Sequence, residues 1–208
     1  MFFVRWVPTF LAYPLGALIA SSVMGSDRSA AAALGAGAIV GAVVGLAQWL
    51  ALGRIVDWRW PLVTTAALAL GSAAATLIVG ARLTPMAAII GGAILGLVGG
   101  ASQGVLVARA VSARRAHAVF RIAAVWAASL SISWAGAWLI TATMPVEFAR
   151  AGVIFGTAGA LAATCVTGVV LRVLLRDRMI RPSPDESARS RMTDAAALVI
   201  SATDDRRD

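Results

Sequence analysis

The stretch GAIVGAVVGLAQWLALGRIV at residues 37–56 returns 55 residues later as GAILGLVGGASQGVLVARAV at residues 92–111. Nine of the twenty aligned positions are identical, including three glycines spaced four residues apart, one glutamine and one arginine. The glutamines are the informative match, because Gln48 and Gln103 are the only two in the chain. Each stretch is apolar over about twenty residues, the length of helix that crosses the hydrocarbon of a bilayer. The repeat therefore predicts two equivalent membrane-spanning helices.

The whole chain shares this apolar character. Of its 208 residues, 60% are hydrophobic and 13% are charged, and the mean hydropathy is +0.84. A soluble domain carries about 25% charged residues, which are needed to coat its surface. The composition therefore excludes an ordinary soluble enzyme and a disordered protein.

Six apolar stretches are each close to the length of a membrane span. Charged residues separate them, and none lies in the middle of a stretch. The first stretch opens with Arg5-Trp6 and the third with Arg59-Trp60, so we read the first as a retained span and not as a cleaved signal peptide. The predicted spans are residues 6–24, 30–52, 60–80, 85–108, 120–143 and 151–175.

The arginines set the expected orientation. All eighteen basic residues are Arg, and the net charge is +8. With a cytoplasmic N-terminus, eleven arginines up to Arg181 fall in cytoplasmic segments and three (Arg28, Arg82 and Arg150) fall in outside loops. Cytoplasmic loops carry an excess of basic residues, so we expect both termini in the cytoplasm and no nucleic-acid partner.

These features predict an all-α integral membrane protein of six transmembrane helices, arranged as three tandem parallel hairpins. The transmembrane domain covers residues 1–176, with hairpin repeats at about residues 5–58, 59–120 and 121–176. Repeats that share one orientation are tandem and not inverted, and three of them can close around a pseudo-threefold axis. Residues 177–208 contain most of the acids and an Arg-Pro-Ser-Pro segment, which predicts a mostly disordered cytoplasmic tail.

The third unit matches the other two poorly, and two registers are open for it. Aligning Arg172 with Arg54 and Arg109 puts Gly159 and Ala163 in glycine positions and Val166 in the glutamine position. The alternative register uses residues 152, 156 and 160 as its small-residue positions.

Two stripes of glycine predict close helix contacts. Glycine at every fourth residue lets a second helix approach closely, which strengthens dispersion contacts where lipid supplies no hydrophobic drive. We expect packing within the chain, with homodimerisation as the alternative. The glycines are Gly37, Gly41 and Gly45 in the second span, and Gly92, Gly96 and Gly100 in the fourth.

Gln48 and Gln103 fall on the same stripes, each six residues before an arginine. That spacing is about 9 Å along a helix, so both amides should lie inside the membrane and face the bundle interior. An amide in hydrocarbon requires partners. Two interpretations remain open: a structural hydrogen bond between helices, or a polar clamp for a headgroup or small solute.

The tryptophans outnumber tyrosine seven to one. Trp6, Trp58 and Trp60 are expected at the cytoplasmic interface, where indole rings are well accommodated. Trp126, Trp134 and Trp138 fall deeper in the spans. Their rings could either fill the space left by small residues or stack on a flat ligand.

The loop between the fourth and fifth spans is strongly basic. Its arginines lie next to the bilayer and predict a surface that binds anionic lipid headgroups. His117 lies in this loop without a second histidine, and Cys165 is the only thiol, so we expect no metal or haem site. The basic residues are Arg109, Arg114, Arg115 and Arg121.

No set of residues for catalysis is apparent. The acids cluster in the tail, no Ser–His–Asp combination or paired carboxylates can share one site, and no phosphate-binding glycine motif is followed by Lys. We therefore expect no enzyme activity, no cofactor and no proton-driven pump.

The repeated Gly-x-x-x-Gly-x-x-Gln-(Trp) ending in Arg, as in residues 41–54, resembles a pattern of uncharacterised bacterial multi-pass membrane proteins. The resemblance covers the second to fourth spans and implies no activity. The Arg-only, Ala-rich composition is typical of a high-GC bacterium and implies the inner membrane. Three tandem hairpins are also found in mitochondrial carriers, but their Pro-x-Asp/Glu-x-x-Lys/Arg signature is missing.

Two functional hypotheses follow. The first is a non-catalytic subunit or scaffold of a larger membrane complex, which would bind a membrane-protein partner. The second is a transporter of a small solute or lipid, or its substrate-binding membrane component.

Overall fold

The computed structural model describes residues 2–25, 27–80, 84–111, 116–143 and 157–176. Within these ranges all regular structure is helical. Six segments are long and apolar enough to cross a membrane, so the architecture suits a multi-pass membrane protein. The elements are α1 (Phe2–Trp6), the 3-10 helix η1 (Val7–Leu11), α2 (Ala12–Met24), α3 (Ala30–Leu52), the 3-10 helix η2 (Gly53–Ile55), α4 (Arg59–Val79), α5 (Pro85–Ala110), α6 (Ala116–Thr143) and α7 (Thr157–Leu174).

The first span is a helix interrupted by a tighter turn. It runs as α1, η1 and α2 from Phe2 to Met24, with Pro8 at the start of η1. Proline lacks an N–H group and clashes with the preceding turn, which disfavours regular α-helix. The break lies immediately after Trp6.

Most predicted span boundaries agree with the helices, and one loop is corrected. The second predicted span, residues 30–52, coincides with α3. The fifth begins at Ala116, four residues before the expected start, because the helix includes the described end of the basic segment, residues 116–121. His117 therefore lies in the first turn of α6 and not in a loop, and its side chain is exposed. Residues 151–156 of the sixth span and the tail at residues 177–208 lie outside the described residues.

Local sequence signals explain several helix ends. Ser29 caps α3 by accepting a hydrogen bond from the Ala32 N–H at 3.1 Å, and Thr84 caps α5 in the same way through Ala87. A side-chain oxygen at this position satisfies an N–H that has no partner inside the helix. At the other ends, Gly25, Gly53 and Gly80 follow α2, α3 and α4 with φ of 65°, 57° and 74°. L residues rarely adopt that conformation.

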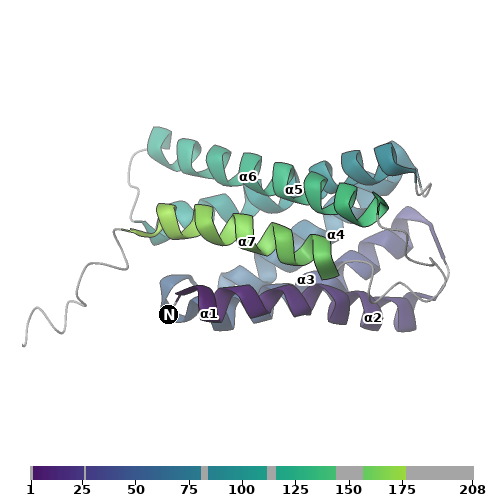
Figure 1. Cartoon of the computed structure of the whole chain (residues 1–208), viewed down its shortest axis with the longest axis horizontal. Helices are drawn as coiled ribbons and strands as arrows, with labels where there is room; N and C mark the ends of the chain where they lie inside the picture. Colours follow the sequence, from purple (N-terminus) through teal and green to yellow (C-terminus); the bar gives the residue numbers. More distant parts are fainter. Residues whose placement is uncertain (1, 26, 81–83, 112–115, 144–156, 177–208) are drawn as a thin grey trace, which may run out of the picture. The chain divides into compact units, whose positions relative to one another are not determined.

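The helices contact one another in a closed ring. Neighbours in sequence pack together from α2 to α7, and α7 also contacts α1, η1 and α2. Figure 1 shows α7 lying between α6 and the α1–α2 segment. The last span therefore closes the ring against the first.

Large aliphatic side chains cover the outside of this ring. Leu46, Leu62, Leu77 and Ile132 are 49%, 59%, 75% and 73% exposed. Extensive exposed apolar surface marks a membrane or protein contact. The interior contains glycine, alanine, hydroxyl side chains and tryptophan, together with buried leucine and valine.

Three tryptophans form the core at one end of the ring, which we call the tryptophan end. Trp6, Trp60 and Trp126 are each no more than 1% exposed. Trp6 and Trp60 thus point into the bundle, and the neighbouring Trp58 is exposed. The same cluster contains Leu52, Val56, Leu106, Val107, Ala110, Leu130, Leu171 and Leu175.

Candidate functional site

The six predicted packing glycines lie on α3 and α5, facing the backbone of the next helix. A Cβ atom on Gly41 would lie 2.7 Å from the Thr65 Cα of α4, and one on Gly96 would lie 2.7 Å from the Ser131 Cα of α6. Both distances are shorter than real Cβ contacts. Gly37 and Gly45 also face α4, and Gly92 and Gly100 also face α6. These close approaches join the second helix of one predicted hairpin to the first helix of the next.

Both glutamines are buried and bonded to neighbouring helices. The Gln48 amide donates to the Tyr13 hydroxyl of α2 at 3.3 Å and accepts from the Trp60 indole of α4 at 3.2 Å. The Gln103 amide donates to the Thr64 hydroxyl of α4 at 2.8 Å. Each amide therefore bridges between spans, as the first of the two interpretations expects.

Gln103 also accepts from the Trp126 indole of α6 at 3.3 Å, repeating the Gln48–Trp60 pair. Thr64 connects the two pairs, because its hydroxyl donates to the Trp60 carbonyl at 2.8 Å. We call this set the hydrogen-bonded belt: Tyr13, Gln48, Trp60, Thr64, Gln103 and Trp126. It ties α2, α3, α4, α5 and α6 together.

The first and last spans make a third indole contact with a different acceptor. The Trp6 indole donates to the Thr164 backbone carbonyl of α7 at 2.9 Å. Thr167 lines the same small void as the two glutamines. Val166, which one register places in the glutamine position, is instead 50% exposed. Burial therefore favours Thr167 as the residue at that place, one position later.

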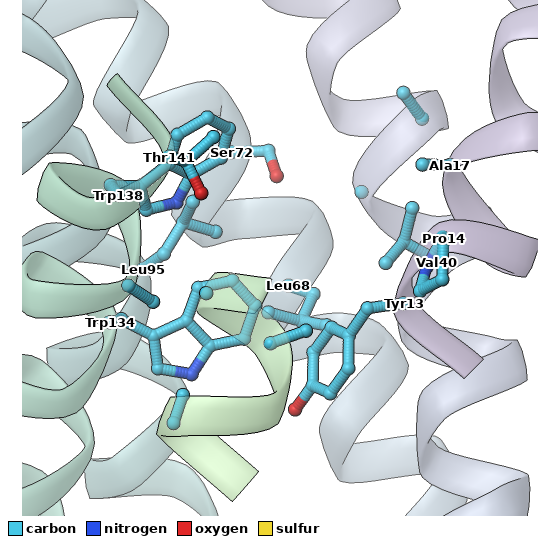
Figure 2. Close-up of a pocket in the computed structure, with 16 residues that line it drawn as sticks. Tyr13, Pro14, Ala17, Val40, Leu68, Ser72, Leu95, Trp134, Trp138 and Thr141 are labelled. Carbon is cyan, nitrogen blue, oxygen red and sulfur yellow. The ribbon is translucent and has the colours of Figure 1, made fainter. Parts of the chain in front are cut away.

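A cavity of about 240 Å³ lies inside the ring, on the side of the belt away from the tryptophan end. We call it the chamber. Figure 2 shows Trp134 and Trp138 on one side of it and Tyr13, Pro14 and Val40 on the other. Its hydroxyl groups are those of Tyr13, Ser72 and Thr141, Trp134 and Trp138 contribute indole rings, and its other lining residues are small or apolar. An apolar wall with a few polar groups is typical of small-molecule sites.

The floor of the chamber is an aromatic pair from opposite sides of the ring. Tyr13 of α2 and Trp134 of α6 meet edge to face with ring centroids 5.1 Å apart. Below them is a void of about 20 Å³ lined by Gln48, Gln103 and Thr167 among others. Beneath the void the tryptophan end is tightly packed. The chamber is therefore blind towards the tryptophan end.

At the opposite end, a groove of about 410 Å³ runs between α2 and α3. It shares Ala17, Ala36 and Val40 with the chamber, so the two spaces adjoin. Charged residues Asp27 and Arg28 line its outer part. We call it the α2–α3 groove.

The predicted basic surface is described only in part. Arg109 and Arg121 are exposed, at the end of α5 and near the start of α6. Arg114 and Arg115 lie outside the described residues. Two further arginines at the tryptophan end contact other parts of the protein. Arg5 donates to the Leu50 carbonyl at 2.8 Å, and Arg172 lies over the Phe3 ring.

Sequence reasoning missed the partners of the glutamines and the chamber. Trp60, Trp126, Tyr13 and Thr64 were not expected to bond the two amides. One signal was available: an indole N–H in hydrocarbon requires an acceptor, and the spans offer just two side-chain amides.

The described interior contains no cluster of groups suited to metal binding: no three His, Cys, Asp or Glu side chains come together within those ranges. What the arrangement can do chemically is hold an apolar molecule against aromatic rings.

In comparisons with known proteins, no family model, curated protein or solved structure matches this chain.

Proposed function

We propose that this chain is a non-catalytic membrane protein that binds a small, mostly apolar molecule in the chamber. It would serve as the substrate-binding component of a larger membrane complex. Both earlier hypotheses contribute to this proposal: the partner would supply energy or catalysis, and this chain would supply the site.

One observation carries the proposal: a mostly apolar chamber, closed towards the tryptophan end, lies beside a hydrogen-bonded polar belt. A dry apolar cavity of about 150 Å³ binds benzene, so a chamber of about 240 Å³ accommodates a larger, two-ring or branched molecule. The tightly packed tryptophan end argues against an open pore. The belt amides are occupied by protein partners, which makes them supports of the floor and not the principal ligand contacts.

The proposal includes the expected topology. Three tandem hairpins would follow a pseudo-threefold axis, with the Trp6, Trp60 and Trp126 contacts as the repeated element. With both termini cytoplasmic in a bacterial inner membrane, the tryptophan end faces the cytoplasm. The chamber then adjoins the outer side.

Binding of 1-naphthol to the purified protein tests the proposal. The binding is measured by energy transfer from the tryptophans to 1-naphthol. Ala160 of α7 lines the chamber, whereas Ala158 is exposed and lines neither the chamber nor the α2–α3 groove. Ala160→Phe should abolish binding by filling the chamber, and Ala158→Phe should leave it intact. Equal binding by both variants would show that the chamber is not the site.

A further inference from the structure

The α2–α3 groove gives the chamber a side entrance with a charged mouth. Its inner part shares Ala17, Ala36 and Val40 with the chamber. Its outer part is lined by Asp27, Arg28 and Ser29, in the segment between the two helices. Apolar walls that lead to a charged rim suit an amphiphile, with the tail inside and the head at the rim.

The mouth carries one charge of each sign, Asp27 and Arg28, so an anionic head must bind at the arginine. The Asp27 carboxylate already accepts hydrogen bonds from the Ser29 N–H at 2.8 Å and the Ser29 hydroxyl at 2.9 Å. Arg28 is exposed, and the ion pair found within the described ranges is Arg59–Asp57, at the tryptophan end. The Arg28 guanidinium is thus the cation at the mouth that can receive an anionic head, and the Asp27 carboxylate keeps its own negative charge beside it.

A second groove, between α4 and α5, makes a useful comparison. It shares Ser72, Leu95 and Trp138 with the chamber, but its described lining residues are all uncharged. Of these two grooves, the α2–α3 groove combines continuity with the chamber and a charged rim among the described residues.

The distance along α3 suits a hydrocarbon tail. Eleven residues separate Ser29 at the mouth from Val40 in the chamber. At a rise of about 1.5 Å per residue they span about 16 Å. A ligand that fills both spaces must be long and narrow, not compact.

We propose that the ligand is a single-chain anionic amphiphile that enters sideways from the bilayer through the α2–α3 groove, with its tail in the chamber and its carboxylate at Arg28. This inference rests on the proposed function, because it takes the chamber as the binding site and adds the ligand class and the route.

The probe is 9,10-dibromostearic acid, a fatty acid whose bromines quench tryptophan fluorescence, added to the full chain in detergent micelles. Trp134 and Trp138 line the chamber and report the tail. The methyl ester of the same acid keeps the tail and removes the charge. Intact-complex mass spectrometry counts the bound molecules, and one per chain is expected.

Two matched pairs of variants test the route and the head. Ala33 lines the groove but not the chamber, and Ala42 is exposed on the same helix. Ala33→Phe should weaken binding of the acid at least ten-fold without changing binding of 1-naphthol, and Ala42→Phe should change neither. Arg28→Gln should weaken the acid about two- to five-fold, as expected for an exposed ion pair, and leave the ester unchanged. Arg54→Gln, at the tryptophan end, is its control.

The outcomes separate the two proposals. If 1-naphthol binding responds to Ala160→Phe while acid binding is indifferent to Ala33→Phe, the groove inference is wrong and the chamber remains a site. If neither probe responds to Ala160→Phe, both proposals fail. If the acid and its ester respond equally to Arg28→Gln, the anionic head is overturned.

Discussion

The indole N–H of Trp60 donates to the side-chain carbonyl of Gln48 at 3.2 Å, and Trp126 repeats this contact with Gln103 at 3.3 Å. The two partners always come from consecutive spans, and in each case a glycine stripe brings the two helices together. Gln48 would not reach Trp60 if larger residues separated α3 from α4. The glycines and the amides therefore act together to position the floor of the chamber.

Replacing the amide should destabilise the protein. Gln48→Leu leaves the Trp60 N–H without its acceptor and the Tyr13 hydroxyl without its donor. We expect a loss of about 1–3 kcal/mol in the free energy of unfolding, the usual cost of leaving buried polar groups unsatisfied. Thermal or denaturant unfolding in mixed micelles measures it.

A double-mutant cycle isolates the pair. Gln48→Leu with Trp60→Phe should show a coupling energy of about 0.5–2 kcal/mol, in the range for polar contacts in membrane proteins. Ser22→Ala is the control, because the exposed Ser22 hydroxyl bonds only to its own helix at Leu18. Strictly additive effects of the two core substitutions would mean that the bond contributes nothing.

Two glycine-to-alanine variants should have opposite effects. A Cβ on Gly41 would lie 2.7 Å from the Thr65 Cα, whereas a Cβ on Gly136 would meet nothing within 4 Å. We expect Gly41→Ala to cost about 1–3 kcal/mol through overpacking and Gly136→Ala to gain up to about 1 kcal/mol in helix propensity. Unfolding midpoints of the two variants provide the comparison.

The same pair tests the alternative of homodimerisation. The Gly41 face is occupied by α4 of the same chain. Gly41→Ala should therefore alter stability and leave the oligomeric state unchanged in light scattering. A variant that folds normally but loses self-association would refute packing within the chain.

The helices were predictable because their signals are local. Lipid requires about twenty apolar residues per span, and local capping residues, Ser29, Thr84 and the glycines at 25, 53 and 80, lie at helix ends in the structure. The predicted start of α6 is four residues late, because Ala116–Val119, of which only His117 is polar, already belong to the helix.

The interior was less predictable because it depends on how distant helices are rotated and closed. That Trp6 bonds Thr164, 158 residues away, requires knowing that α7 packs against the first span. The chamber is harder still, because its volume is what remains when small residues of several helices meet two tryptophans and a tyrosine. Gln48 and Gln103 were identifiable because their rarity and shared register are properties of the sequence.

Asp27 should make stability depend on pH only under acidic conditions. Hydrogen bonds from the Ser29 N–H and hydroxyl hold the pKa of Asp27 below its ordinary value. Because the folded form prefers the charged carboxylate, its contribution is complete above the unfolded pKa of about 3.9 and is lost as the pH falls through the folded value. Asp27→Asn should flatten this part of the stability profile below about pH 4. An unchanged acid limb would assign the dependence to other acids.

Cysteine labelling tests the proposed orientation, since Arg28 and Arg54 are exposed at opposite ends of α3. Cys165 is the only native thiol and is itself exposed, so the background is Cys165→Ala. With the tryptophan end in the cytoplasm, a membrane-impermeant maleimide should label Arg28→Cys in intact cells and label Arg54→Cys only after permeabilisation. The excess of arginine on one side gives the physical reason, because translocating basic loops is unfavourable. The reverse labelling pattern would place the chamber and the α2–α3 groove on the cytoplasmic side, and the amphiphile would then have to enter from the cytoplasmic leaflet.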